Sequence, residues 1–278
     1  MIVRRSDDGT QQAISKGFET VAEQYLSEFG IQGDIPIIVC GMAGAKQGWR
    51  EASYINTPTK FEEIISNSVS VPHRSRDIRI LPGICQRNLL DPDIMRGKET
   101  QLLGLLEHLP ENGLICMPGN HSKWVKIGQK RLEHFSTFMT GEIFGILAGD
   151  SILKLQGDVS LEIIPSSHAF HRAFNETVEN PSELTNRLFK THSSRILGYS
   201  SPDSNAAVLS GCLLGLEFAG AQSKYGQINE VSLIASSRLG KLYESALNSR
   251  GVSVNRFDAE EAVVRGLYKA ATTIWPIK

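Results

Sequence analysis

The chain has 278 residues, of which 41% are hydrophobic and 21% charged, and its formal net charge at pH 7 is −1. This composition is that of an ordinary globular protein, and the length allows one large domain or two lobes. Because the net charge is close to zero, no overall field attracts nucleic acid or an anionic membrane, and we expect neither as a partner.

The four cysteines are far apart in the sequence and form no CxxC pair. Each lies in an apolar stretch, which favours small, buried, reduced side chains over disulfides or a metal site made of protein ligands. They are Cys40, Cys85, Cys116 and Cys212. No apolar run follows the two N-terminal arginines, and Asp150 interrupts the longest later apolar stretch. We therefore expect a cytoplasmic protein without a signal peptide or a membrane span.

The first part of the chain alternates between helical and strand-like patterns. Apolar residues recur at helical spacing in 17–30, 61–69 and 99–109, whereas 35–42 and 76–83 are short apolar runs typical of buried strands. Such alternation favours a mostly parallel sheet covered by helices on both faces.

A different pattern begins at residue 113. Three strand-like runs, 113–119, 120–128 and 131–141, follow one another closely, with a turn at 129–130 and a helix after the last run. Three antiparallel strands followed by a helix are typical of the opening of an RNase-H-like lobe. Helices are predicted within 160–222. The chain then alternates again, with strands at 231–237 and 252–257 and helices at 239–251 and 258–271.

The segment MPGNHSKWV (117–125) takes a predicted strand into Pro-Gly and then into a tight polar bend. Gly119 permits close approach of a ligand, and the backbone N–H groups of such a bend can form a concavity that binds phosphate. His121 and Lys123 would add charge or hydrogen bonds. The alternative is an ordinary hairpin turn whose polar residues serve solubility, and the residues alone leave both interpretations open.

The segment DPDIMRGKETQLLGLL (91–106) places Arg96, Gly97 and Glu99 at the start of a predicted helix. The helix dipole stabilises an ionised carboxylate at this end. Such a carboxylate could accept the proton of a substrate hydroxyl, which is the general-base role in phosphoryl transfer. A glutamate in a first helical turn is also a common favourable cap, so a purely structural role is an equal alternative.

Two loops that follow predicted strands are further candidates, since α/β proteins bind ligands at the carboxyl ends of strands. In CGMAGAKQGWREASY (40–54), Lys46 and Arg50 suit a carboxylate and Trp49 suits the wall of a sugar pocket. In LIASSRLGKLYESAL (233–247), small residues lead into a helix N-terminus that could abut an adenine ring or a phosphate. The alternatives are a glycine-rich loop with a packed tryptophan and a plain strand–helix unit.

In their order and spacing these segments resemble the 2-dehydro-3-deoxygalactonokinase family, which is similar to the sugar kinases of the actin and hexokinase superfamily. The matching runs are CGMAGAKQGWREASY, LPGICQ, PDIMRGKETQLLG, MPGNHSKWV, FSTFMTGEIFGIL, LSGCLLGLEFAGA and VSLIASSRLGKLYESAL. The resemblance implies an α/β fold with two RNase-H-like lobes around a cleft: a sugar-acid lobe at 1–111 and a nucleotide-binding lobe at 112–278. It implies ATP and Mg²⁺ as cofactors and phosphorylation of the 6-hydroxyl of 2-dehydro-3-deoxy-D-galactonate, a small-molecule sugar acid. A homodimer is compatible with it.

The resemblance also implies roles for individual residues. Glu99 is expected to be the catalytic base, with Arg96 as a second catalytic residue. The nucleotide and its phosphates are expected to bind to Gly119, Asn120, His121, Ser122, Lys123, Ala235 and Ser236. The sugar acid is expected to bind to Lys46, Gly48, Trp49 and Arg50.

Three features depart from the family pattern. The family begins with an Asp-Trp-Gly-Thr-Thr-like phosphate loop, and nothing before Arg4 resembles it, so we expect the first lobe to lack its leading strands. Lys98 stands where the family usually has Glu, and Asn120 replaces the usual Thr. The rival hypothesis is a catalytically impaired or non-catalytic ligand-binding homologue. A hydrolase built on His121 and Ser122 has no nucleophile-elbow context.

Overall fold

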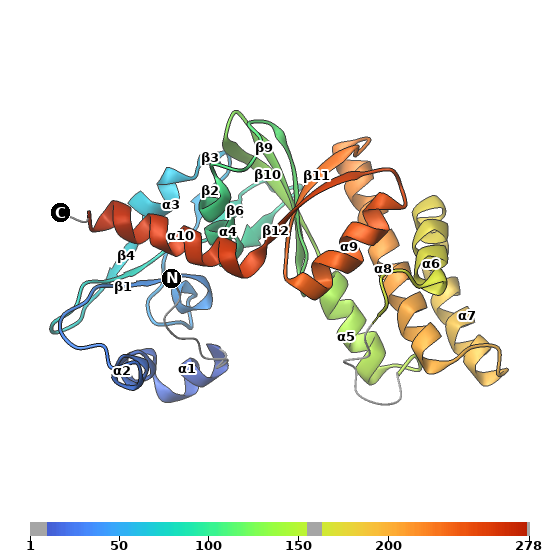
Figure 1. The fold of residues 1–278 in the computed structure, drawn as a ribbon, viewed down its shortest axis with the longest axis horizontal. Coiled ribbons are helices and arrows are strands. Elements are labelled where there is room, and N and C mark those ends of the chain that lie inside the picture. Colours follow the sequence, from blue (N-terminus) through green and yellow to red (C-terminus); the bar gives the residue numbers. More distant parts are fainter. Residues whose placement is uncertain (1–9, 155–162, 277–278) are drawn as a thin grey trace. The chain divides into compact units, whose positions relative to one another are not determined.

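The structure is a computed structural model that describes residues 10–154 and 163–276, and it consists of two compact units (Figure 1). The first unit comprises Met1–Glu111, Gly128–His134 and Glu260–Lys278, and the second comprises Asn112–Ile127 and Phe135–Ala259. The chain thus passes from the first unit to the second after Glu111, which is the boundary expected from the sequence. The expected second lobe, 112–278, differs from the second unit because the last helix belongs to the first unit.

The first unit contains short strands in two three-stranded sheets, ordered β1-β5-β4 and β2-β6-β7. Their strands are β1 (Ile37–Val39), β2 (Ile55–Asn56), β4 (Val69–Val71), β5 (Ile78–Ile80), β6 (Ile84–Gln86) and β7 (Asp93–Met95). A further short strand of this unit, β3 (Thr59–Lys60), belongs to neither of these sheets and pairs with β10 (Arg131–Phe138). β1 with β5 and β2 with β6 are parallel, whereas β4 with β5 and β6 with β7 are antiparallel. The expected mostly parallel sheet is therefore wrong for this unit. The links between β4 and β5 and between β6 and β7 are too short for the crossover that a parallel pair needs.

The helices of the first unit are α1 (Thr10–Lys16), α2 (Phe18–Glu28), α3 (Glu62–Ser66), α4 (Lys98–Leu105) and α10 (Ala259–Ile274), with a 3₁₀ turn, η1 (Gly41–Gly44). The sequence predicted α2 and α10 close to these bounds, and it predicted α3 and α4 a few residues too long at their C-terminal ends. β3 pairs with Arg131 and Leu132 at the start of β10 (Arg131–Phe138), and these two residues belong to the first unit.

Helices α4 and α10 approach each other closely at two glycines. A Cβ atom on Gly104 would lie 2.0 Å from the carbonyl oxygen of Ala262, and one on Gly266 would lie 2.0 Å from the carbonyl oxygen of Thr100. Only glycine permits this backbone-to-backbone contact. The contact explains why the last helix is part of the first unit, a feature that the period of its apolar residues does not reveal.

We expect Gly266→Ala to lower the free energy of unfolding by about 2 kcal/mol, because the helices must move apart to admit the methyl group. The matched control is Gly145→Ala, where a Cβ on a helix of the second unit meets nothing within 4 Å. That variant should be neutral or more stable by about 0.5 kcal/mol, since alanine favours a helix. Urea unfolding followed by circular dichroism measures both. Equal stability of Gly266→Ala and the wild type would contradict the packing described.

The second unit is a sheet covered by helices, with strand order β12-β11-β8-β9-β10. Its elements are β8 (Gly113–Met117), β9 (Ser122–Gly128), β10, α5 (Thr140–Asp150), α6 (His168–Glu179), η2 (Pro181–Glu183), α7 (Leu184–Ile196), α8 (Pro202–Tyr225), β11 (Glu230–Ala235), α9 (Ser237–Asn248) and β12 (Ser253–Asp258). β9 is antiparallel to β8, whereas β11 is parallel to both β8 and β12. The predicted turn between β9 and β10 is confirmed: Gln129 and Lys130 both have positive φ, as a two-residue hairpin loop requires.

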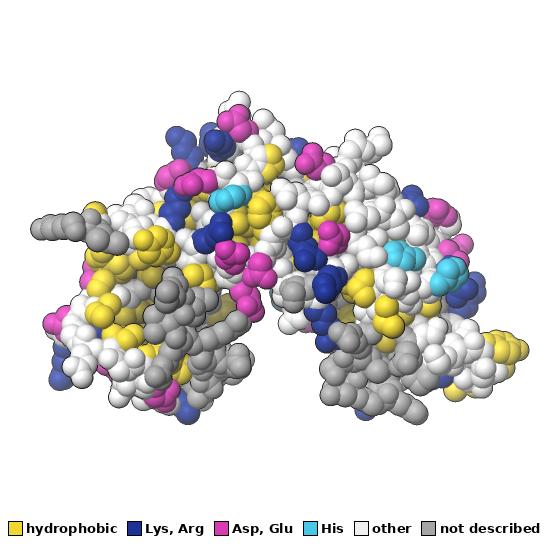
Figure 2. Space-filling view, in the orientation of Figure 1, with side chains coloured by type: hydrophobic (Ala, Val, Ile, Leu, Met, Phe, Trp, Pro, Cys, Tyr) yellow, Lys and Arg dark blue, Asp and Glu magenta, His cyan; other side chains and the backbone are white. Residues whose placement is uncertain are grey.

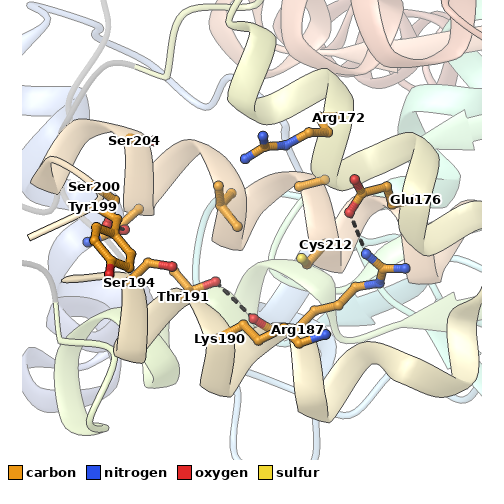
Figure 3. A pocket seen from close by; sticks show the side chains of 13 residues that line it. Arg172, Glu176, Arg187, Lys190, Thr191, Ser194, Tyr199, Ser200, Ser204 and Cys212 are labelled. Carbon is orange, nitrogen blue, oxygen red and sulfur yellow. Dashed lines mark hydrogen bonds and ion pairs between the residues drawn. The ribbon is translucent and has the colours of Figure 1, made fainter. Parts of the chain in front are cut away.

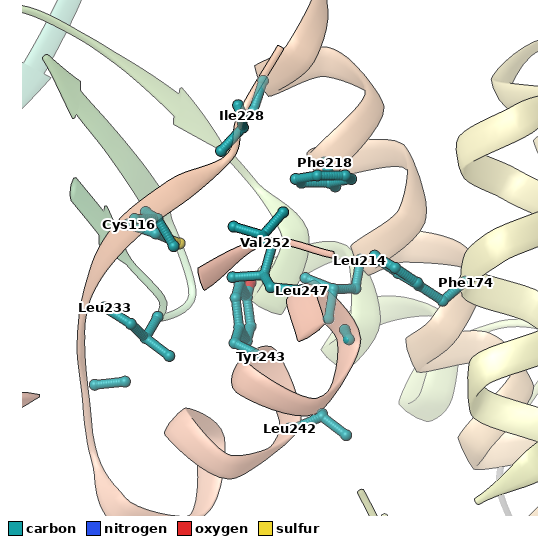
Figure 4. Packing of buried hydrophobic residues seen from close by; sticks show 14 of the residues in the cluster. Cys116, Phe174, Leu214, Phe218, Ile228, Leu233, Leu242, Tyr243, Leu247 and Val252 are labelled. Carbon is teal, nitrogen blue, oxygen red and sulfur yellow. The ribbon is translucent and has the colours of Figure 1, made fainter. Parts of the chain in front are cut away.

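The core of the second unit lies between the sheet and helices α6, α8 and α9 (Figure 4). Cys116 and Leu233 on strands face Phe218, Tyr243 and Leu247 on helices. By length and composition alone α8 would be long enough to cross a membrane, but 67% of its apolar segment is buried inside the protein, as in a core helix. On the face shown in Figure 2, basic and acidic side chains are interspersed, in line with the net charge of −1.

Candidate active site

The loop after β1 in the first unit is held in shape by one glycine. A Cβ on Gly48 would lie 2.4 Å from the carbonyl oxygen of Ala43, which accepts a hydrogen bond of 2.7 Å from the backbone N–H of Trp49. The Trp49 ring stacks on Phe18 with centroids 6.1 Å apart and packs against the core that contains Ala52. Trp49 therefore has a packing role, the alternative that the sequence left open.

Lys46 and Arg50, the basic residues expected to bind the sugar acid, are both exposed. Neither makes a hydrogen bond or an ion pair with another residue in the described part of the chain. Two exposed cations on one short loop can turn toward an anion without first breaking an ion pair. The structure thus leaves this pair available to a carboxylate ligand.

Arg96 follows β7 and is bound within the first unit. Its Nη2 donates to the carbonyl oxygen of Ala52 at 2.8 Å, and its guanidinium carbon lies 4.2 Å from the centre of the Tyr54 ring. Nη1 is buried and has no hydrogen-bond partner among the described residues. A Cβ on Gly44 would lie 2.7 Å from that atom, so this glycine makes room for the guanidinium. Arg96 is oriented firmly and keeps one donor unused.

Glu99 lies in the first turn of α4 and is completely buried. Its Oε1 accepts a hydrogen bond of 2.7 Å from the backbone N–H of Gly97, the N-cap residue, whose φ of 101° suits glycine. Its Oε2 is buried and has no partner among the described residues. One oxygen thus caps the helix, as the structural interpretation held, while the other remains able to accept a proton.

Burial raises the pKa of Glu99 from its ordinary value of 4.5 to about 7, although backbone hydrogen bonds and the charge of Arg96 act in the opposite direction. Burial also raises the pKa of the neighbouring Cys40 thiol to about 11, with a further increase from the Glu99 carboxylate. A carboxyl group that titrates near neutral pH is well suited to general-base catalysis, whereas a thiol with so high a pKa is not a nucleophile.

In the second unit, the Gly119–Asn120 bend after β8 lies against the start of α5. A Cβ on Gly141 would lie 2.6 Å from the carbonyl oxygen of Gly119, and the backbone N–H of Glu142 donates to the carbonyl oxygen of Asn120 at 3.1 Å. Glycine at 141 is what permits this close approach. The helix N-terminus and the bend thereby form one wall of a cavity.

The cavity has a volume of about 300 Å³ and its lining is mostly apolar. It is lined by Gly119, Asn120, Thr140, Gly141, Phe144, Ile163, Ser210, Leu213, Leu214, Leu239, Leu242 and Tyr243. The residues come from the bend, from α5, α8 and α9, and from the segment before α6. A concave apolar site with a few polar groups is typical of small-molecule binding.

Of the residues expected at the phosphates, Gly119 and Asn120 line this cavity, whereas the next three do not. His121 pairs with Glu142, and the Ser122 hydroxyl lies 3.0 Å from that of Tyr243. Lys123 is 6% exposed, and its Nζ donates to the hydroxyl of Thr137 in the sheet. Because the Ser122 hydroxyl is engaged with a tyrosine, a Ser-His hydrolase has no support.

Ala235 and Ser236, expected near the adenosine, lie at the end of β11 and at the N-cap of α9. Ala235 is buried in the core, and Ser236 is exposed without a side-chain capping bond. Leu239, Leu242 and Tyr243, one to two turns further along α9, line the cavity. The two expected residues do not line the cavity, and residues further along the same helix do.

Glu217 is a residue of the site that the sequence reasoning missed. It lies on α8, is 1% exposed, and accepts hydrogen bonds from Trp124 Nε1 and the Tyr243 hydroxyl, each at 2.9 Å, and from the Thr140 hydroxyl. Two of these donors, Thr140 and Tyr243, line the cavity. The sequence did contain an indication of this buried carboxylate, because Glu217 is the single charged residue in the apolar run NAAVLSGCLLGLEFAGA.

A second cavity of the same unit, of about 260 Å³, lies among α6, α7 and α8 (Figure 3). It contains Arg172, Arg187 and Lys190, but Arg187 is bound to Glu176 in the same cavity and to Glu183 at 3.1 Å. The charges are thus partly compensated, and the first cavity remains the better candidate for a nucleotide.

Comparison with a solved structure assigns this α/β fold to a class of small-molecule kinases. A crystal structure of a 2-dehydro-3-deoxygalactonokinase protein from Sinorhizobium meliloti matches with a TM-score of 0.92 and 45% sequence identity, over 99% of this chain and 91% of that one. The family model described as 2-keto-3-deoxy-galactonokinase matches residues 1–270. The chain belongs to this family, and the resemblance read from the sequence is confirmed.

Curated relatives agree with this assignment. The probable 2-dehydro-3-deoxygalactonokinase DgoK1 of Rhizobium meliloti (strain 1021) is 46% identical over 99% of this chain and 90% of its own length. The 2-dehydro-3-deoxygalactonokinase of Escherichia coli (strain K12) is 28% identical over 98% of this chain and 90% of its own length.

Proposed function

We propose that this protein is an ATP-dependent kinase that transfers the γ-phosphate of ATP to the 6-hydroxyl of 2-dehydro-3-deoxy-D-galactonate. Membership of the family supports the reaction class. The observation that carries the mechanism is the buried Oε2 of Glu99, which lacks a partner among the described residues. A buried unpaired acceptor is costly, and a substrate hydroxyl that donates to it removes that cost.

In this proposal the first unit binds the sugar acid. Glu99 accepts the proton of the attacking hydroxyl, and Arg96 offers its unused Nη1 donor beside it. Lys46 and Arg50 bind the substrate carboxylate, since both are exposed and form no ion pair with any residue that the structure describes. Gly48 and Trp49 hold the loop in shape. Arg96 Nη1 and Glu99 Oε2, which lack partners among the described residues, support this arrangement. A hydroxy acid has oxygen atoms that accept from the arginine and a hydroxyl that donates to the glutamate.

The second unit binds ATP in this proposal. The apolar cavity of about 300 Å³ suits a purine nucleoside, and the bend at Gly119 with the N-terminus of α5 suits the phosphates. The strand order β12-β11-β8-β9-β10, with β9 antiparallel to β8, supports an RNase-H-like lobe. Lys123 reaches the phosphates only if it leaves Thr137, so Gly119 and Asn120 are the stronger candidates.

The described lining of the proposed nucleotide cavity includes no Asp or Glu, so Mg²⁺ would be held there chiefly by the phosphates of ATP. The described residues contain no group of three or more His, Cys, Asp or Glu side chains placed to hold a metal ion. Kinases commonly hold Mg²⁺ through one or two carboxylates together with substrate phosphates and water. Mg²⁺ bound in this way would neutralise charge on the transferred phosphoryl group.

The test is to incubate the purified protein with ATP, Mg²⁺ and candidate 2-dehydro-3-deoxy sugar acids and to follow ADP release in a coupled assay. We expect release that depends on the sugar acid, with a product phosphorylated at the 6-hydroxyl by nuclear magnetic resonance. If calorimetry shows that ATP and the sugar acid both bind but no ADP forms, the protein is instead the non-catalytic homologue. The family match and the curated relatives do not favour that alternative. A homodimer and a cytoplasmic location remain predictions.

A further inference from the structure

The buried carboxylate of Glu217 joins four elements of the second unit around the cavity. Trp124 from β9 donates to its Oε1, whereas Thr140 from α5 and Tyr243 from α9 donate to its Oε2. Glu217 itself comes from α8. Hydrogen bonds from three donors satisfy both carboxylate oxygens although the residue is 1% exposed. This network depends on contacts within one unit only.

The hydrogens of this network can be assigned by counting donors. The indole N–H of Trp124 can only donate, and an ionised carboxylate can only accept. Tyr243 has one hydroxyl hydrogen, which lies on Glu217, so in the 3.0 Å contact with the Ser122 hydroxyl the serine is the donor. The carbonyl oxygen of Gly119, 3.5 Å from the Ser122 hydroxyl, is the other acceptor of the same serine hydrogen. The ionised form of Glu217 uses every donor. Burial raises the pKa of this carboxyl group, and the same hydrogen bonds lower it.

The positions of these hydrogens determine which hydrogen bonds the cavity can form with a ligand. Thr140 lines the cavity, and its single hydroxyl hydrogen is used by Glu217, so in any hydrogen bond between this hydroxyl and a ligand the ligand must be the donor. A ligand group that donates is accepted there, whereas a group that is only an acceptor, such as a phosphate oxygen, is repelled. Two parts of ATP can donate: the ribose hydroxyls and the 6-amino group of adenine.

We propose that Glu217 is a positioning residue that sets the hydrogen-bond polarity of the cavity, so that Thr140 accepts a hydrogen bond from a donor group of the bound nucleotide. This inference rests on the proposed nucleotide site. It deepens that proposal by naming the Thr140 hydroxyl as the group that recognises the base or the ribose. Glu217 acts through Thr140 and does not touch the nucleotide.

Glu217→Gln tests the inference because it changes polarity while keeping shape. The amide oxygen of glutamine is expected to accept from Trp124, so its NH₂ group faces Thr140 and Tyr243. Both hydroxyls then lose their acceptor, and the Thr140 hydrogen turns into the cavity. We expect the KM and the calorimetric Kd for ATP to rise about five- to tenfold, the value of one hydrogen bond. The KM for the sugar acid should stay the same.

Three nucleotide analogues distinguish the donors. ITP replaces the 6-amino group with an acceptor, 2′-deoxy-ATP lacks the 2′-hydroxyl, and 3′-deoxy-ATP lacks the 3′-hydroxyl. In the wild type, the analogue without the recognised donor should bind about five- to tenfold more weakly than ATP. In Glu217→Gln that ratio should fall to near one. Thr140→Val, which removes the hydroxyl itself, should make ATP and that analogue bind equally well. The affinity ratios for the other analogues should stay as in the wild type.

The control is Glu230→Gln, an exposed glutamate of β11 for which we expect wild-type behaviour throughout. Melting temperatures check folding, and if Glu217→Gln does not fold, Thr140→Val and the analogues alone decide the question. A folded Glu217→Gln with wild-type ATP affinity and unchanged analogue ratios overturns the inference, as does a Thr140→Val variant that keeps the ratio. If the wild type binds no nucleotide at all, the proposed function fails instead.

Discussion

Replacing Glu99 with glutamine is expected to lower kcat by about 10²- to 10⁴-fold, the usual contribution of general-base catalysis. Glutamine keeps the size of the side chain, and its amide oxygen can still accept the hydrogen bond from the N–H of Gly97. It cannot take up the proton of the attacking hydroxyl. The Kd for ATP should be unchanged, because the nucleotide is proposed to bind to the other unit. Initial rates of ADP release and calorimetry measure the two effects.

Glu62→Gln is the matched control, since Glu62 also lies in the first turn of a helix of the same unit but is exposed. It should keep wild-type kcat, which separates the base from the favourable helix cap. In the wild type, kcat/KM should fall as the pH drops below about 7, the pKa of Glu99. A Glu99→Gln variant that retains more than a tenth of wild-type kcat would remove this residue from the mechanism.

The second large effect concerns stability. The folded-state pKa of Glu99 is about 7, above its ordinary value of 4.5, so between these values the folded protein binds more protons than the unfolded one. Stability therefore decreases as pH rises through this window, and the ionised carboxylate costs about 3 kcal/mol once the pH exceeds 7. Below pH 4.5 the group is protonated in both states and the cost vanishes.

The measurement is the free energy of unfolding of the wild type minus that of Glu99→Gln, from urea titrations at pH 4.5 and pH 8. The subtraction removes the contributions of other titrating groups. We expect the difference to shift by about 3 kcal/mol against the wild type at the higher pH. A difference that does not depend on pH would show that Glu99 titrates as an ordinary glutamate. The expected shift, by contrast, would mean that activity and stability are in conflict at this residue, since the ionised form required of a base is the costly one.

The sequence located much of the architecture because helices and strands have different apolar periods. The runs at 17–30, 113–119 and 231–237 became α2, β8 and β11. The hairpin turn at Gln129 and Lys130 was also predictable. For the first unit the same reasoning failed in sheet topology, because it does not specify which short strands pair or in which direction.

The sequence by itself determined the family and most elements of the second unit, and it suggested the segments of the candidate site, since motifs and periods are properties of neighbouring residues. Of the short strands of the first unit it predicted only those at 35–42 and 76–83. Only the tertiary structure decided which side chains are buried and which distant groups they meet. Packing buries Glu99, which raises its pKa, and it places Lys123 against Thr137. It also brings three hydrogen-bond donors from separate elements to Glu217. Burial and long-range contacts depend on how elements pack, and a local pattern carries no record of that packing.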